Sequence, residues 1–202
     1  MMKTILLPTI ICLLAALLRG AAAISCPEEL PGKVELPSSG LTLYYGVLKN
    51  EGALCGKLES NIEAWMGFGA QPAGTHAMVG AHAIIVLPTP RTVQQYMLNG
   101  KSASQVVLAE KQTLTETSVT NEGGKTIATF KQPLDDDGLK LTSTNVYLLA
   151  IGRSNELGYH LNRGFVTLDF EKNIITSTIG STKGETELAL ELNLRGQAIR
   201  FE

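Results

Sequence analysis

The stretch Ala64-Trp65-Met66-Gly67-Phe68-Gly69 carries the chain's single tryptophan among small and apolar residues. A large aromatic side chain in such surroundings is expected in a core, so we predict that Trp65 is buried. Glycine within a strand often marks a place where another backbone approaches closely. Gly67 and Gly69 therefore indicate tight packing between neighbouring strands.

A second tract lies a few residues downstream and reads Met78-Val79-Gly80-Ala81-His82-Ala83-Ile84-Ile85. Its small and apolar residues predict a strand over residues 77–86. Side chains alternate between the two faces of a strand, so we expect Met78, Gly80 and His82 to share one face.

Short segments rich in β-branched or aromatic residues, bounded by Gly, Pro, Asn or Ser, recur along the rest of the chain. The periodicity of one further segment fits a strand or a helical turn (residues 92–97), and that of another fits a last strand or a helix (residues 185–194). The remaining segments predict strands at residues 41–45, 146–151, 164–170 and 174–179, and a hairpin at residues 113–132 with its turn at residues 121–124. Many short strands joined by turns indicate an all-β sandwich or barrel.

The first 23 residues have the pattern of a secretory signal peptide: Lys3, an apolar run over residues 5–18, and Ala21-Ala22-Ala23. We expect the mature chain to begin near Ile24 and residues 24–202 to form a single domain. The apolar run is shorter than the roughly 20 residues of a membrane-spanning helix. The C-terminal tail lacks the hydrophobic end of a lipid-anchor signal. These features predict a secreted protein with no membrane span.

Removal of the signal peptide changes the charge and the cysteine count. It takes away Lys3 and Arg19 and no acidic residue, so the net charge falls from −2 to about −4. An acidic balance argues against nucleic acid or an anionic membrane as the main partner. Cys26 and Cys55 remain, and in an oxidising compartment they are expected to form a disulfide. Such a bridge should stabilise the fold by about 3 to 4 kcal/mol, because it restricts the unfolded chain.

The motifs of common enzymes are missing from the sequence. His76, His82 and His160 lack the spacing of a zinc site, and there is no Gly-x-Ser-x-Gly, P-loop or dinucleotide fingerprint. The run Asp135-Asp136-Asp137 lacks the full spacing of a calcium loop, which favours a solvated turn. We therefore predict no catalytic residue.

The order and spacing of several segments resemble the DOMON family, named for the non-catalytic domain of dopamine β-monooxygenase. The resemblance covers roughly residues 41–170 and is carried by Trp65 to Gly69, Gly74, Met78 to Ala83, Asn145 to Gly152, His160, and Gly164 to Phe170. It implies an immunoglobulin-like antiparallel β-sandwich that binds haem b or a sugar. The haem-binding branch of the family includes the cytochrome domain of cellobiose dehydrogenase and secreted b-type cytochromes of plants.

Carried over position by position, the resemblance implies that Met78 and His160 are the axial ligands of a haem iron. His82 stands where the family more often has an acidic or neutral residue, and it is a second, less favoured ligand. Gly80 next to Met78 would leave room for a flat macrocycle. A thioether and an imidazole fill both axial positions, which suits electron transfer and disfavours oxygen binding.

Three further residues are assigned more weakly to the haem pocket. Trp65 belongs to the matching tract, while Arg153 and Arg163 flank His160 in the sequence and are candidates to pair with the haem propionates. Solvated surface arginines are the alternative for both.

The resulting prediction is a secreted b-type cytochrome that transfers single electrons and is not itself an enzyme. Its partners would be a small reductant such as ascorbate, or a secreted or membrane redox protein. The alternative is a haem-free carbohydrate-binding or adhesion module on the same sandwich. Such a module needs an aromatic platform, for which the candidates are Tyr44, Tyr45, Tyr96 and Tyr159.

Overall fold

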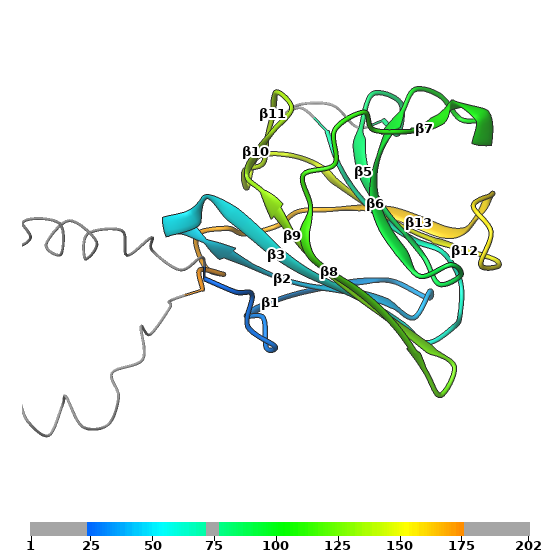
Figure 1. The fold of residues 1–202 in the computed structure, drawn as a ribbon, viewed down its shortest axis with the longest axis horizontal. Coiled ribbons are helices and arrows are strands. Elements are labelled where there is room, and N and C mark those ends of the chain that lie inside the picture. The colour runs from blue at the N-terminus through cyan, green and yellow to red at the C-terminus, as the bar shows by residue number, and fades with distance from the viewer. Residues whose placement is uncertain (1–23, 72–76, 176–202) are drawn as a thin grey trace, which may run out of the picture.

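The computed structural model describes residues 24–71 and 77–175, and their strands pair antiparallel into two main sheets that pack face to face (Figure 1). The fold is the predicted antiparallel β-sandwich. The predicted signal peptide, Gly74, His76, the segment 185–194 and most of the strand predicted at 174–179 lie outside the described residues.

One sheet has five strands in the order β1-β2-β3-β9-β8. The predicted hairpin is confirmed as β8 and β9, joined through Gly123 and Gly124, whose φ angles of 58° and 81° need glycine. The strands of this sheet are β1 (Gly32–Leu36), β2 (Leu41–Leu48), β3 (Ala53–Ser60), β8 (Thr115–Glu122) and β9 (Lys125–Pro133).

The other sheet has six strands in the order β13-β12-β4-β5-β6-β7. Residues 92–97, whose pattern fits either a strand or a helical turn, belong to a strand. The strand predicted at 164–170 is found at residues 160–166 instead. The strands are β4 (Met66–Ala70), β5 (His82–Leu87), β6 (Thr92–Leu98), β7 (Val106–Leu108), β12 (Tyr147–Gly152) and β13 (His160–Val166).

Four short elements complete the described part of the chain. The strands β10 (Asp135–Asp136) and β11 (Leu139–Lys140) pair with each other in a small separate ribbon. Two single 3₁₀ turns, η2 (Lys49–Glu51) and η3 (Ala103–Gln105), lie between strands. Among the described residues no helix is long and apolar enough to span a membrane.

Strand β4 shows how the sequence divides the two faces of the sheet. It reads Met66-Gly67-Phe68-Gly69-Ala70, so alternation sends Met66, Phe68 and Ala70 to one side and the glycines to the other. The Phe68 ring stacks on Tyr147 at 5.5 Å and on Phe130 of the opposite sheet at 5.8 Å between ring centroids. The large side chains thus form the core between the sheets, and the outer face of β4 is left nearly flat.

The predicted disulfide is confirmed at one end of the sandwich. Cys26 and Cys55 are bonded, with their Cα atoms 5.7 Å apart. Cys55 belongs to a small apolar cluster with Leu48 and Ala53, against which Ile24 packs. The bridge therefore ties the segment before β1 to the middle of the five-stranded sheet.

Candidate functional site

A cavity of about 740 Å³ lies on the outer face of the six-stranded sheet, within the size range of small-molecule and cofactor sites. Its walls are the segments 77–79, 101–106 and 157–160, which flank the sheet. Its floor is made of small or aliphatic residues that alternate with the core residues of the same strands: Gly67, Gly69, Ala83, Ile85, Leu148 and Ala150.

Gly67 and Gly69 leave space open above this floor because they have no side chains. A Cβ added at Gly69 would lie 3.3 Å from the His82 carbonyl oxygen and 3.4 Å from the Leu148 side chain, and one added at Gly67 would lie 3.5 Å from the Trp65 ring. Side chains at these two positions would fill the space above β4. The stretch that identifies the sandwich therefore also shapes the cavity.

Met78 lines the cavity from a turn rather than from a strand, which corrects the predicted strand over residues 77–86. The Ala81 N–H donates to the Met78 carbonyl at 3.2 Å, and Gly80 has a φ of 87°, a conformation that breaks an extended strand. Strand β5 begins only at His82. The expected shared face of Met78, Gly80 and His82 is therefore wrong, and Gly80 itself is not among the cavity-lining residues.

Gln71 holds the Met78 turn at both of its ends, a role that the sequence alone did not reveal. Its side-chain oxygen accepts from the Ala77 N–H at 2.9 Å, and its side-chain nitrogen donates to the Val79 carbonyl at 3.3 Å. Gln71 is 1% exposed, and its own carbonyl accepts from the Asn145 side chain at 2.7 Å. The backbone on either side of Met78 is thus tied to the sheet.

His160 lines the same cavity as Met78, at the start of β13. The pairing of β12 with β13 skips Leu161, between the pairs Gly152–His160 and Ile151–Asn162. Such a bulge re-aims side chains that strict alternation would place on the other face. His160 consequently lies on the cavity side of the sheet.

The His160 imidazole has the properties of a neutral, available ligand. Its Nδ1 atom is buried and has no hydrogen-bond partner among the described residues. Burial, together with the positive charge of Arg163, lowers the pKa of His160 below its ordinary value. The neutral ring is the form in which histidine binds a metal ion.

Trp65 is buried, as predicted, and forms the wall next to His160. The centroids of the two rings lie 5.6 Å apart. Gly152 makes room for the indole, because a Cβ on Gly152 would lie 2.0 Å from Trp65 Nε1. Two backbone hydrogen bonds fix the segment: Trp65 N–H to the Ser154 carbonyl at 2.9 Å, and Gly152 N–H to the Trp65 carbonyl at 2.8 Å.

Two cations line the otherwise largely apolar cavity, Lys101 and Arg163. Arg163 was named as a candidate from the sequence, whereas Lys101 was missed. Arg153, the other predicted arginine, is exposed just after β12 and is not among the cavity-lining residues. An apolar floor with cationic groups at its edge suits a flat apolar molecule that carries acidic groups.

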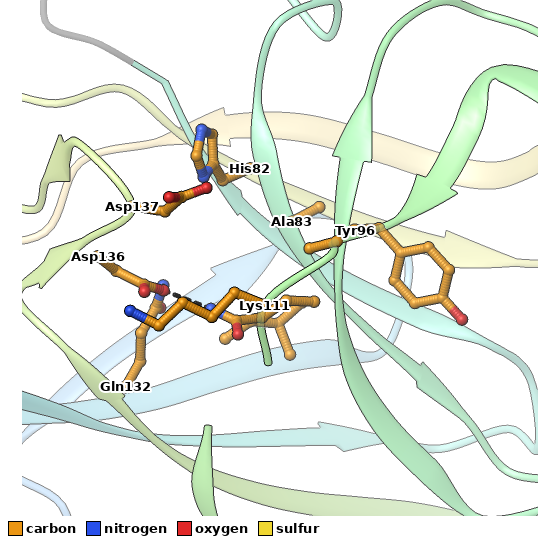
Figure 2. A pocket seen from close by; sticks show the side chains of 10 residues that line it. His82, Ala83, Tyr96, Lys111, Gln132, Asp136 and Asp137 are labelled. Carbon is orange, nitrogen blue, oxygen red and sulfur yellow. Dashed lines mark hydrogen bonds between the residues drawn. The ribbon is translucent and has the colours of Figure 1, made fainter. Parts of the chain in front are cut away.

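His82 lines a different and much smaller cavity, of about 10 Å³, which is room for one water molecule. Figure 2 shows His82 beside Asp137, while the Tyr96 ring points away from both. Asp136 lies deeper in this cavity, is 6% exposed, and accepts from Thr113 Oγ1 at 2.8 Å and from the Gln95 side chain. The structure therefore does not bring His82 to the site of Met78 and His160.

The tyrosines considered for a sugar platform do not gather on one surface. Tyr44 lies on β2 with Lys57 over its ring, and Tyr45 is buried in the core. Tyr96 lies on β6 of the other sheet, and Tyr159 is 78% exposed just before β13. Only Tyr159 lines the large cavity.

The fold class is an antiparallel β-sandwich that is similar to a solved cytochrome domain. In particular, the structure resembles the cytochrome domain of cellobiose dehydrogenase from Myriococcum thermophilum, with a TM-score of 0.53 and 13% sequence identity over 79% of this chain and 88% of that chain. At this identity the likeness concerns the fold alone. No protein-family model matches the chain, and no curated protein sequence matches it.

Proposed function

We propose that this chain is an exported electron-transfer protein that binds haem b through Met78 and His160. The observation that carries the proposal is that both side chains line one cavity, although they lie 82 positions apart in the sequence. Met78 comes from a turn and His160 from the start of β13. A thioether sulfur and an imidazole nitrogen are two established axial ligands of haem iron. Among the described residues that line the cavity, Met78 supplies the thioether and His160 the imidazole.

The remainder of the cavity fits the same group. The flat floor over Gly67 and Gly69 accepts a planar apolar ring, and Arg163 and Lys101 supply cations for its two propionates. The buried Nδ1 of His160 has no hydrogen-bond partner among the described residues. A buried polar atom without a partner calls for an explanation, and a group bound at the imidazole would supply one.

Haem supplies a one-electron redox couple, and the protein determines how it is used. A Met and His pair stabilises the reduced state relative to two imidazoles and leaves no axial position for oxygen. The chain would therefore act as an electron carrier rather than an enzyme. Its electrons would come from a small reductant such as ascorbate or pass to a separate secreted or membrane redox protein. The Cys26–Cys55 bridge supports an oxidising compartment outside the cytosol.

Titration of the purified protein with haem, followed by absorption spectroscopy, tests the proposal. We expect binding that saturates at one haem per chain and, after reduction, the sharp visible bands of six-coordinate low-spin haem. Absence of saturable binding would overturn the function, including the ligand assignment.

Matched variants separate the ligands from other residues of the same type. His160→Ala should abolish the low-spin spectrum, whereas His82→Ala should preserve it, because His82 lines the other cavity. If His82→Ala alone removed the low-spin bands, haem binding would stand and His160 would be the wrong ligand.

A further inference from the structure

The N–H of Ile24, the first residue after the predicted signal peptide, donates to Glu51 Oε1 of η2. The Ile24 carbonyl accepts from Lys131 Nζ at 2.6 Å. Both polar groups of the Ile24 backbone are therefore bound by charged side chains that lie far away in the sequence. Surface residues at the start of a domain are rarely held in this way.

Lys131 connects two carboxylates at this point. Its Nζ lies 2.6 Å from Glu51 Oε2 and 3.2 Å from Glu116 Oε1, and Glu116 Oε2 accepts from the Cys26 N–H at 2.8 Å. Lys131 is 7% exposed. Two anions thus face one cation in a partly buried cluster, which leaves one negative charge uncompensated.

The charged state of these groups follows from their contacts. The hydrogen bond from Lys131, followed by that from the Ile24 N–H, lowers the pKa of Glu51. Burial lowers the pKa of Lys131, but its hydrogen bonds to Glu51 and Glu116 outweigh burial and raise it. Glu51 and Lys131 are therefore ionised at neutral pH.

The Ile24 side chain is fixed by apolar contacts. It packs against the cluster of Leu48, Ala53 and Cys55, and the disulfide at Cys26 holds the chain two residues further on. An isoleucine at this position contributes buried apolar surface where a polar residue would not. The segment is positioned by its side chain, its backbone and a covalent bond together.

We propose that a signal peptidase cleaves the chain between Ala23 and Ile24 and that the new α-ammonium group binds Glu51 in an ion pair that completes this cluster. The step is hydrolysis: one water molecule is consumed, the Ala23–Ile24 peptide bond breaks, Ala23 gains a carboxylate and Ile24 an ammonium group. Small residues at Ala21 and Ala23 suit such a protease. In the uncleaved chain the same nitrogen is a neutral amide, and the excess negative charge of the cluster remains.

Expression of the full-length precursor in a secreting host, followed by N-terminal sequencing of the secreted protein, tests the cleavage position. Ile24 as the first residue is the expected result. A secreted protein that begins at any other residue would overturn the proposal, because its terminal charge would lie away from Glu51.

A stability cycle tests the ion pair itself. One protein begins at Ile24 and a second carries one additional glycine before Ile24, and both are made with Glu51 and with Glu51→Gln. We expect the additional glycine to lower Tm by about 2–4 °C at pH 6.5, as for the loss of about 1 kcal/mol. The effect should vanish in Glu51→Gln and persist in Glu171→Gln, which removes an exposed pair with Lys49 instead.

The pH dependence has a defined sign. The charged groups that contact this terminus are Glu51, Glu116 and Lys131, and the ammonium contributes only while it is protonated. An unpaired α-amino group has a pKa of about 7.7–8.0, and pairing with a carboxylate raises it. The stabilisation should therefore be complete at pH 6.5 and be lost as the pH rises through the raised pKa of the folded state. An equal effect of the additional glycine in Glu51→Gln would overturn the ion pair.

Discussion

The ring centroids of Trp65 and His160 lie 5.6 Å apart, with an angle of 57° between the ring planes. Both rings line the large cavity, and Trp65 is the only tryptophan of the chain. Its fluorescence therefore reports directly on the surroundings of His160.

Haem added to the purified protein should quench the Trp65 fluorescence strongly and saturate at one equivalent, because the bound group would lie against the indole. Fluorescence titration measures this effect. N-acetyl-tryptophanamide at the same absorbance corrects for light absorbed by free haem. Quenching no greater than in this control would mean that haem does not enter the cavity.

Gly152→Ala should destabilise the protein by about 1–3 kcal/mol, the range for overpacking of a closely packed site. The new Cβ would lie 2.0 Å from Trp65 Nε1 and displace the indole. Gly158→Ala is the matched control, because the nearest atom to its Cβ is 3.9 Å away. Urea unfolding measures both, and equal losses would show that the contact between Trp65 and Gly152 is not tight.

Gln71→Ala should weaken the attachment of the Met78 turn. It removes the hydrogen bonds to the Ala77 N–H and the Val79 carbonyl. We expect stability lower by about 0.5–1.5 kcal/mol for each hydrogen bond, because the partners on Ala77 and Val79 can be solvated. In the haem-loaded protein we expect a mixture of spin states in place of a single low-spin form. Gln94→Ala on β6 serves as a control that leaves the turn intact. A purely low-spin Gln71→Ala protein would contradict this positioning role.

Acid should destabilise the haem-free protein through His160. Burial and Arg163 lower the pKa of this histidine in the folded state, whereas the unfolded value is about 6.5. The unfolded chain therefore binds a proton first, and stability that is complete above pH 6.5 is lost as the pH falls through the folded pKa. Urea unfolding between pH 7.5 and 5 should show a smaller loss for His160→Asn than for the wild type. An identical loss in both proteins would count against a buried neutral His160.

The strand-rich fold was predictable because its signals are local, whereas the choice of a sandwich over a barrel came from the resemblance to a known family. Alternation in the segment Met66 to Ala70, and paired glycines at the turn between β8 and β9, depend on a few neighbouring residues. The Cys26–Cys55 bridge followed from the cysteine count and the expected compartment. Such features do not require knowledge of which strands become neighbours.

The details of the site were less accessible, because they depend on backbone conformation. The tract around Met78 has the same composition as a strand, and only the positive φ of Gly80 turns it into a loop. The bulge at Leu161 re-aims His160 and depends on the register of two strands. Lys101 reaches the cavity from a distant loop, which no pattern in the sequence connects to His160.

The most direct test of the central claim is the near-infrared spectrum of the oxidised, haem-loaded protein, in which a bond between methionine sulfur and ferric haem iron produces a charge-transfer band. We expect this band in the wild type and in Met97→Leu, whose side chain lies on β6 and does not line the large cavity. Met78→Leu should abolish it while haem is still bound through His160. A band that survives in Met78→Leu, or that is absent from the haem-loaded wild type, would contradict ligation of the iron by Met78.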